Sequence, residues 1–102
     1  RMSVQHNLSK DGDELTIRVN GRFDFSAHGD FRAAYQSVTP LPRKLVVDLS
    51  KADYMDSAAL GMLLALRERG GGPDSNIHIV GANPFIRQLL SVSRFETLFK
   101  VA

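Results

Sequence analysis

The chain has 102 residues, of which 43% are hydrophobic and 24% charged, a composition typical of one small globular domain. Thirteen Lys and Arg against eleven Asp and Glu leave a formal net charge of +2, so charge gives no reason to expect nucleic acid or an acidic membrane as the partner. Cysteine is absent, which excludes disulfides, thiolate metal sites and cysteine nucleophiles.

The first half of the chain predicts a hairpin followed by a helix. Residues 4–8 alternate weakly between apolar and polar side chains, and Asp11–Gly12 supplies turn chemistry. The alternation is clean over residues 15–20, which predicts a half-buried strand paired with the first. Residues 21–25 continue less regularly. Residues 27–38 then place apolar side chains at helical spacing, which predicts a helix that two following prolines end.

The second half alternates strands and helices. Residues 45–47 are a continuous apolar run, which predicts a strand covered on both faces. Residues 57–69 predict a helix that ends at three glycines, and residues 77–80 predict the next strand. Asn83–Pro84 has the residue types of a helix N-cap and first turn. Residues 95–101 predict a short turn and an edge strand.

This order of elements predicts an α/β fold with one mixed β-sheet and helices packed on it. Strand–helix–strand units pair their strands in parallel, and the opening hairpin adds antiparallel pairing. The longest apolar stretch, Ala58–Leu66, is too short to span a bilayer. No apolar signal-peptide region is present at the N-terminus. We therefore expect a single cytoplasmic domain over residues 2–102, with Met2 as the natural start and Arg1 foreign to it.

Metal and nucleotide sites have little support in the sequence. His6, His28 and His78 do not stand at metal-ligand spacing from one another. Glycines 70–72 end a helix, whereas phosphate-binding loops open one. We expect no metal and no cofactor.

Catalysis is the weaker interpretation of the carboxylates and the serine near residue 57. Asp48, Asp53 and Asp56 could act in acid–base chemistry, but Asp56 stands where a helix N-cap is favoured. Ser57 could be a nucleophile, yet it lacks a Gly-x-Ser-x-Gly elbow and a neighbouring histidine. A serine hydrolase stays open only as a minor alternative, and we expect a protein that is not an enzyme.

The helix over residues 57–69 is apolar on more than one side. At 100° per residue, one face is predicted to cover the sheet with Ala59, Leu60, Leu63 and Leu64. The opposite face is predicted to carry Ala58, Gly61, Met62 and Ala65. Either another element of the domain covers this second face, or it is a docking surface for a partner, since exposed apolar patches mark interaction sites.

Ser57 lies at the start of that helix, beside the second face. Phosphorylation would add about −1.5 to −2 charges there. The positive end of the helix dipole would tolerate the phosphate, whereas a docked partner would have to desolvate it or dissociate. The position therefore suits an on/off switch for binding.

Four segments resemble the STAS domain, and more narrowly the free-standing anti-sigma-factor antagonists of bacteria. They are Val46–Ser50, Tyr54–Gly61, Ile79–Gly81 and Pro84–Leu90. The resemblance extends from the first hairpin to Phe99. Its most specific part is the Asp-Ser pair that opens a helix, with Leu-Gly shortly after.

The resemblance implies partner switching. The unphosphorylated antagonist would bind an anti-sigma factor with serine-kinase activity and so free a sigma factor. The kinase would phosphorylate Ser57, and a serine phosphatase would reset it. Gly21–Asp24 matches an earlier family element, which implies that Asp24 lies near Asp56 and Ser57 and helps form the partner surface. Neither direct nucleic-acid binding nor membrane insertion is implied.

The sequence departs from the family pattern after Ser57 and at its end. Ala58 and Ala59 stand where many members have a second hydroxyl residue and a glycine. The usual last helix is expected to be missing, because the chain stops at Ala102. Some STAS proteins are not phosphorylated and serve as subunits of lipid transporters or signalling complexes. A constitutive interaction subunit is therefore the alternative to the phosphoswitch.

Overall fold

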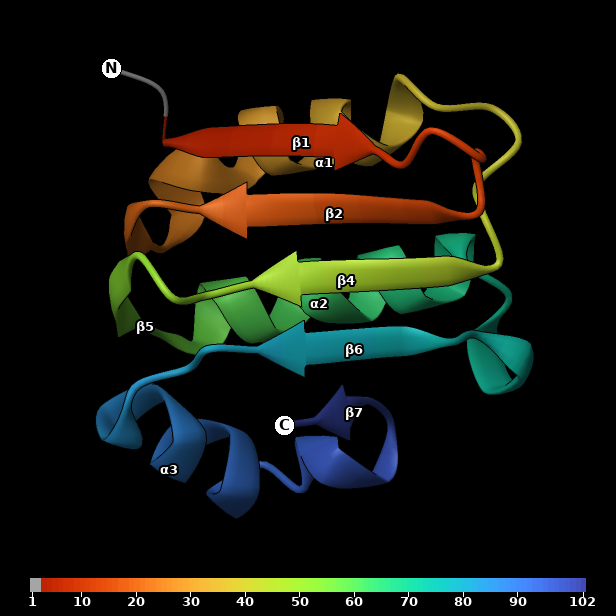
Figure 1. Ribbon diagram of the computed structural model, residues 1–102. Coiled ribbons are helices and arrows are strands. Elements are labelled where there is room, and N and C mark those ends of the chain that lie inside the picture. The colour runs from red at the N-terminus through yellow and green to blue at the C-terminus, as the bar shows by residue number, and fades with distance from the viewer. Residues whose placement is uncertain (1–2) are drawn as a thin grey trace.

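The computed structural model describes residues 3–102, so the expectations for Arg1 and Met2 lie outside the described residues. Figure 1 shows the arrangement of the elements. In chain order these are β1 (Val4–Leu8), β2 (Glu14–Val19), β3 (Gly21–Phe23), the 3₁₀ turn η1 (Phe25–Ala27), α1 (His28–Gln36), β4 (Lys44–Asp48), β5 (Ala52–Met55), α2 (Ser57–Arg69), η2 (Gly72–Asp74), β6 (Ile77–Val80), α3 (Pro84–Val92), η3 (Phe95–Thr97) and β7 (Lys100–Val101).

Five strands form the main sheet, in the order β1-β2-β4-β6-β7. β1 is antiparallel to β2, and every other neighbouring pair is parallel. The predicted hairpin, the parallel pairing in the second half and the mixed α/β class are confirmed. β7 is the short edge strand expected near the C-terminus. Between α3 and β7 the structure has only the short turn η3.

Helices cover one face of this sheet. Figure 1 shows α1 and α2 behind the strands and no helix in front of them. Leu45 and Val47 are buried toward the helices, whereas Val46 is half-buried and lies in register with Thr16 and His78. The prediction that residues 45–47 are covered on both faces is therefore wrong. On this face of the sheet, Val46 lies between a threonine and a histidine, which suits a partly hydrated surface. A short apolar run in the sequence cannot distinguish such a surface from full burial.

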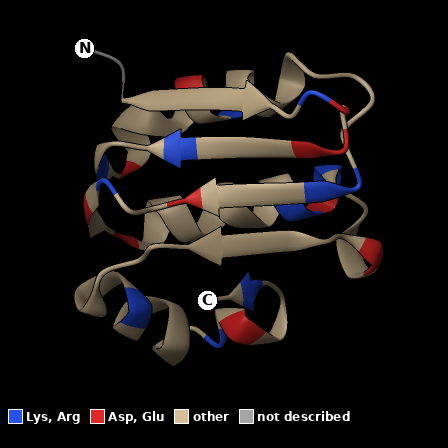
Figure 2. Cartoon of the chain, viewed as in Figure 1, with Lys and Arg blue, Asp and Glu red and all other residues tan. Residues whose placement is uncertain are grey.

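The charged residues of β2 and β4 lie at or near the strand ends, as the coloured cartoon in Figure 2 shows. At one end Arg18 donates from Nε to Asp48 Oδ2 over 3.1 Å, and at the other Lys44 Nζ lies 3.3 Å from Glu14 Oε1. Exposed pairs of this kind contribute little to stability, about 0–1 kcal/mol each. Their placement nevertheless matches the parallel register of the two strands, because a slip by one residue would separate both pairs.

A second, two-stranded parallel ribbon joins β3 to β5. The sequence pattern over residues 21–25 is irregular, and the pattern over residues 52–55 predicts no strand. Phe23 and Met55 are opposite each other at the end of the ribbon and are both buried. Because the strands are parallel, the segments that follow them, η1–α1 and α2, begin side by side. The ribbon therefore brings residues after position 23 next to residues after position 55.

Candidate functional site

Asp56 caps the helix that Ser57 opens. The backbone of Asp56 is extended, and its carboxylate accepts hydrogen bonds from the amides of Ala58 and Ala59, at 3.0 and 3.4 Å from Oδ1. This confirms the expected helix start and the N-cap interpretation of Asp56. Ser57 is exposed in the first helical position, Ala58 is half-buried, and Ala59 is fully buried in the core. A larger residue at position 59 would therefore have to displace core side chains.

Asp24 is a second N-cap, one strand away. It follows Phe23 on β3 as Asp56 follows Met55 on β5, and Phe23 pairs with Met55. Its Oδ1 accepts hydrogen bonds from the amide and the hydroxyl of Ser26, the amide at 3.0 Å, and so caps η1. The expected closeness of Asp24 to the start of α2 thus has a geometric basis in the parallel ribbon.

Arg22 also binds Asp24, with Nε 3.0 Å from Oδ2. Hydrogen bonds from Ser26, and then from Arg22, lower the pKa of Asp24 from its ordinary value. The carboxylate is therefore charged at neutral pH. Two carboxylates, of Asp24 and Asp56, consequently flank the start of α2.

Aromatic side chains that the sequence pattern does not single out lie near the start of α2. The guanidinium of Arg22 lies 3.9 Å from the centre of the Tyr54 ring, and Tyr54 stacks on Phe85, with 6.1 Å between ring centres. Phe25 stacks on His28 at 5.1 Å and is 70% exposed, and Phe85 is 56% exposed. The sequence gives no signal for these aromatic residues, because single exposed aromatic side chains show no periodicity. Tyr54 belongs to β5 and Phe85 to α3, so only the folded chain brings these two rings together.

The exposed side of α2 differs from the predicted one. Met62 is only 6% exposed and packs in the core, whereas Leu64 is 39% exposed. The buried stripe of the helix is Ala59, Met62, Leu63 and Leu66. The exposed stripe, called the α2 face below, is Ser57, Gly61, Leu64 and Ala65. Both the assignment of Met62 to the partner surface and that of Leu64 to the sheet are therefore wrong.

The physical reason is that residues 58–66 are apolar all round. Without a polar side, the hydrophobic pattern does not fix the rotation of a helix about its own axis. The predicted and the observed buried faces of α2 differ by less than the roughly 100° that separates one residue from the next. The α2 face nevertheless keeps the predicted character. It carries no charge before Glu68, and its side chains are small apart from Leu64.

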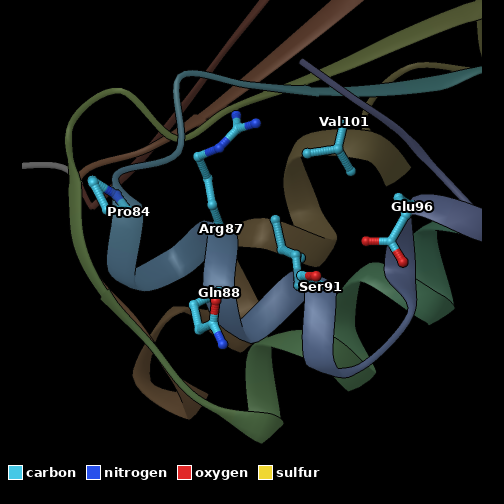
Figure 3. Close-up of a pocket in the computed structure, with 7 residues that line it drawn as sticks. Pro84, Arg87, Gln88, Ser91, Glu96 and Val101 are labelled. Atoms are coloured by element: carbon cyan, nitrogen blue, oxygen red, sulfur yellow. The ribbon is translucent and has the colours of Figure 1, made fainter.

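A surface hollow of about 500 Å³ lies away from this region. Figure 3 shows it between α3 and the last residues, where it is lined by Arg87, Ser91, Glu96 and Val101 among others. Arg87 Nη1 donates to the carbonyl of Ala102 over 2.9 Å. No residue of the expected site lines this hollow.

Within residues 3–102, no three His, Asp or Glu side chains lie close enough together to hold a metal ion. His6, His28 and His78 lie apart on β1, α1 and β6. The pKa of His78 is lowered by its partial burial and then by the positive charges of Lys44 and Lys100. No helix in this part of the chain is long and apolar enough to cross a bilayer.

Removal of the Asp56 cap is expected to weaken the fold. The Asp56→Ala variant leaves the amides of Ala58 and Ala59 without their side-chain acceptor, at a cost of about 1 kcal/mol in the free energy of unfolding. Urea denaturation followed by circular dichroism measures the change. Asp56→Ser, which keeps an acceptor oxygen, is the matched control and should stay close to wild type. Equal stability of Asp56→Ala and wild type would contradict the capping role.

Comparison with known sequences gives consistent matches. The sequence model of a family described as the Mlab STAS domain matches residues 6–100. A STAS-domain-containing protein of Pseudomonas aeruginosa is 53% identical over 101 residues, which are 99% of this chain and 100% of that protein.

Solved structures share the fold. One is the STAS domain of an anti-sigma-factor antagonist from Rhodobacter sphaeroides, 33% identical with a TM-score of 0.57, where the match covers 76% of this chain and 84% of that one. Another is a sulfate transporter family protein from Wolinella succinogenes, with a TM-score of 0.73 at 12% identity, covering 91% of this chain and 79% of that one. The second likeness concerns the fold alone. The fold thus occurs in anti-sigma-factor antagonists and in sulfate transporter proteins.

Proposed function

The chain belongs to the STAS domain family, and from that premise we propose that it is an anti-sigma-factor antagonist regulated at Ser57. In its unphosphorylated form it binds an anti-sigma factor that has serine-kinase activity. Phosphorylation of Ser57 releases that partner, and a serine phosphatase restores binding. The chain itself acts as a binding module and not as an enzyme. The 33% identity to an anti-sigma-factor antagonist supports this choice within the family.

The observation that carries the proposal is the position of Ser57. Its side chain is exposed at the first residue of α2, at the head of the uncharged α2 face. A kinase can reach it, and a partner lying on Gly61 and Leu64 would cover it. Modification and binding would then compete for one place on the surface.

The capping geometry strengthens the expected effect of a phosphate. The amides of Ala58 and Ala59 already donate to Asp56, so a phosphate on Ser57 would not find them free. The carboxylates of Asp24 and Asp56 would also repel it. The phosphate would therefore point toward solvent or toward the docked partner, which must desolvate about −1.5 to −2 charges or leave.

A capture experiment tests this proposal. Wild type, Ser57→Ala and Ser57→Asp serve as baits in lysate of the source cells, and Ser91→Asp, an exposed serine on α3, is the matched control. We expect wild type, Ser57→Ala and Ser91→Asp to retain an anti-sigma factor with a kinase domain. Ser57→Asp should bind it at least about 30-fold more weakly, because one uncompensated charge in an interface costs about 2 kcal/mol or more.

The kinase reaction provides the second readout. Incubation of the captured partner with ATP and wild-type protein should add one phosphate at Ser57, found by peptide mass spectrometry, and none to Ser57→Ala. Equal affinity of Ser57→Asp and wild type for this partner would overturn the switch.

A constitutive interaction subunit is the second candidate, favoured by the match to the family described as the Mlab STAS domain. It would use the α2 face without modification at Ser57. The same capture distinguishes the two, because transporter subunits retained equally by wild type and Ser57→Asp support this candidate alone.

A further inference from the structure

A groove runs between α1 and α2, directly beside the α2 face. It encloses about 370 Å³ and is lined on the α1 side by His28, Arg32 and Tyr35 and on the α2 side by Ala65 and Arg69. Ala65 belongs both to this groove and to the α2 face. The groove therefore continues the surface that begins at Ser57.

The groove lies over the buried aromatic side chain of Tyr35. Tyr35 is only 5% exposed, and its ring packs edge-on against Phe31, with 6.0 Å between ring centres. Ala65 gives the α2 wall of the groove a small side chain, and Gly61, one turn before it on the exposed α2 face, has none. Leu64 stands beside them, 39% exposed. A helix could approach such a wall closely and cover Leu64.

The rim carries a net positive charge, because Arg32 and Arg69 outnumber Glu68. Arg32 is exposed on α1, and the guanidinium of Arg69 lies 6.0 Å from the centre of the Tyr35 ring. Within residues 3–102 neither arginine has a carboxylate at ion-pair distance. Glu68, the acidic residue at the groove, lies 3.9 Å from Arg67 instead. The two arginines are thus available to an incoming acidic group.

From these features we propose that the α1–α2 groove binds an acidic amphipathic helix of the protein partner. Apolar side chains of that helix would lie on Ala65 and Leu64, and its carboxylates would pair with Arg32 and Arg69. The inference rests on the proposed function, because it places this helix on the same partner that covers Ser57. It adds the chemistry of the recognised segment and a second region of contact.

Two synthetic peptides of about 18 residues, about five helical turns, test the groove. Both carry the same leucine stripe, and their polar positions are Glu in one and Lys in the other. The full-length ¹⁵N-labelled protein is titrated with each at low salt. We expect the Glu peptide to shift the amide resonances of α1 and α2 along the groove. The Lys peptide should bind at least about tenfold more weakly.

Charge reversal provides the control within the protein. Arg32→Glu should weaken binding of the Glu peptide about tenfold, whereas Lys10→Glu, an equal change in net charge in the β1–β2 turn, should leave the dissociation constant within about twofold. The proposal is overturned by any of three results. These are no shifts with the Glu peptide up to millimolar concentration, shifts confined to other surfaces, or equal affinities of Arg32→Glu and Lys10→Glu.

The outcome is independent of the Ser57 experiment. If the peptide titration fails while the Ser57→Asp variant still releases the anti-sigma factor in the capture experiment, only the groove proposal is overturned. Peptide binding in the groove with no effect of Ser57→Asp on capture would instead remove the phosphoswitch and leave the groove as a contact surface.

Discussion

The Met62→Glu variant is expected to lose most of its folding stability. Met62 is 6% exposed and belongs to the buried stripe of α2 together with Leu63 and Leu66. A glutamate there must bury a carboxylate among apolar side chains or pull α2 away from the sheet. Either course should lower the free energy of unfolding by about 4 kcal/mol or more, against about 5–15 kcal/mol for a typical domain.

Leu64→Glu is the matched control, two residues along the same helix. Leu64 is 39% exposed, so its replacement should change the free energy of unfolding by less than about 1 kcal/mol. Because Leu64 lies on the α2 face, we expect this variant to fold and to lose the partner. Denaturation curves and capture on the same samples separate the effects. A Met62→Glu variant as stable as wild type would contradict the burial of α2, and an unaltered partner affinity of Leu64→Glu would contradict docking on the α2 face.

Gly81→Ala is expected to be the second most damaging single change. Gly81 follows β6 with a backbone φ of 76°, a left-handed conformation that side chains disfavour. An added Cβ would lie 2.8 Å from Ser50 Cβ and 2.9 Å from the backbone nitrogen of Ser50. Since the clash includes backbone, the loop after β4 must move. We expect a loss of about 3 kcal/mol in the free energy of unfolding, from backbone strain and the shift together.

Gly61→Ala makes the same chemical change in an open place. It lies inside α2, where a Cβ meets nothing within 4 Å. Alanine is the better helix former, so this variant should gain about 0.5–1 kcal/mol. Thermal or urea denaturation of the pair should therefore give shifts of opposite sign. A Gly81→Ala variant that unfolds at the wild-type midpoint would show that the Ser50 loop yields without cost.

Much of the fold could be predicted from local pattern. The alternation over residues 15–20 places Leu15, Ile17 and Val19 on the buried side, as the structure has them. The Asn83–Pro84 pair begins α3 as expected, with Asn83 Oδ1 accepting from the amide of Ile86 at 2.8 Å. These features depend on neighbours in the sequence, so the sequence alone carries their signal.

What the pattern missed depends on distant partners. β3 has three residues and β5 four, and each becomes a strand only by pairing with the other. The rotation of α2 about its axis depends on how the helix packs against α1 and the sheet. The sequence of residues 57–69 alone does not determine that packing. Which face of the sheet the helices leave uncovered likewise depends on the tertiary fold and not on any one segment.

The candidate site likewise contains residues that local sequence predicts and residues that only the fold brings together. Asp56 and Ser57 could be placed from their own segment, because a capped helix start is a local feature. Arg22, Tyr54 and Phe85 come from three elements and are joined by stacking that only the folded chain shows. The position of Asp24 beside α2 was implied by the family resemblance, and the β3–β5 register supplies its physical cause.

The β3–β5 ribbon has a thermodynamic consequence. Asp24 and Ser57 are 33 positions apart in the sequence and become neighbours only when both strands have paired. A partner that contacts both therefore recognises the native state and not the unfolded chain. By mass action it should raise the apparent stability by about 2.7 kcal/mol when its free concentration is a hundred times its dissociation constant. Phosphorylation would withdraw that stabilisation together with the partner, so the released form should melt at a lower temperature than the complex.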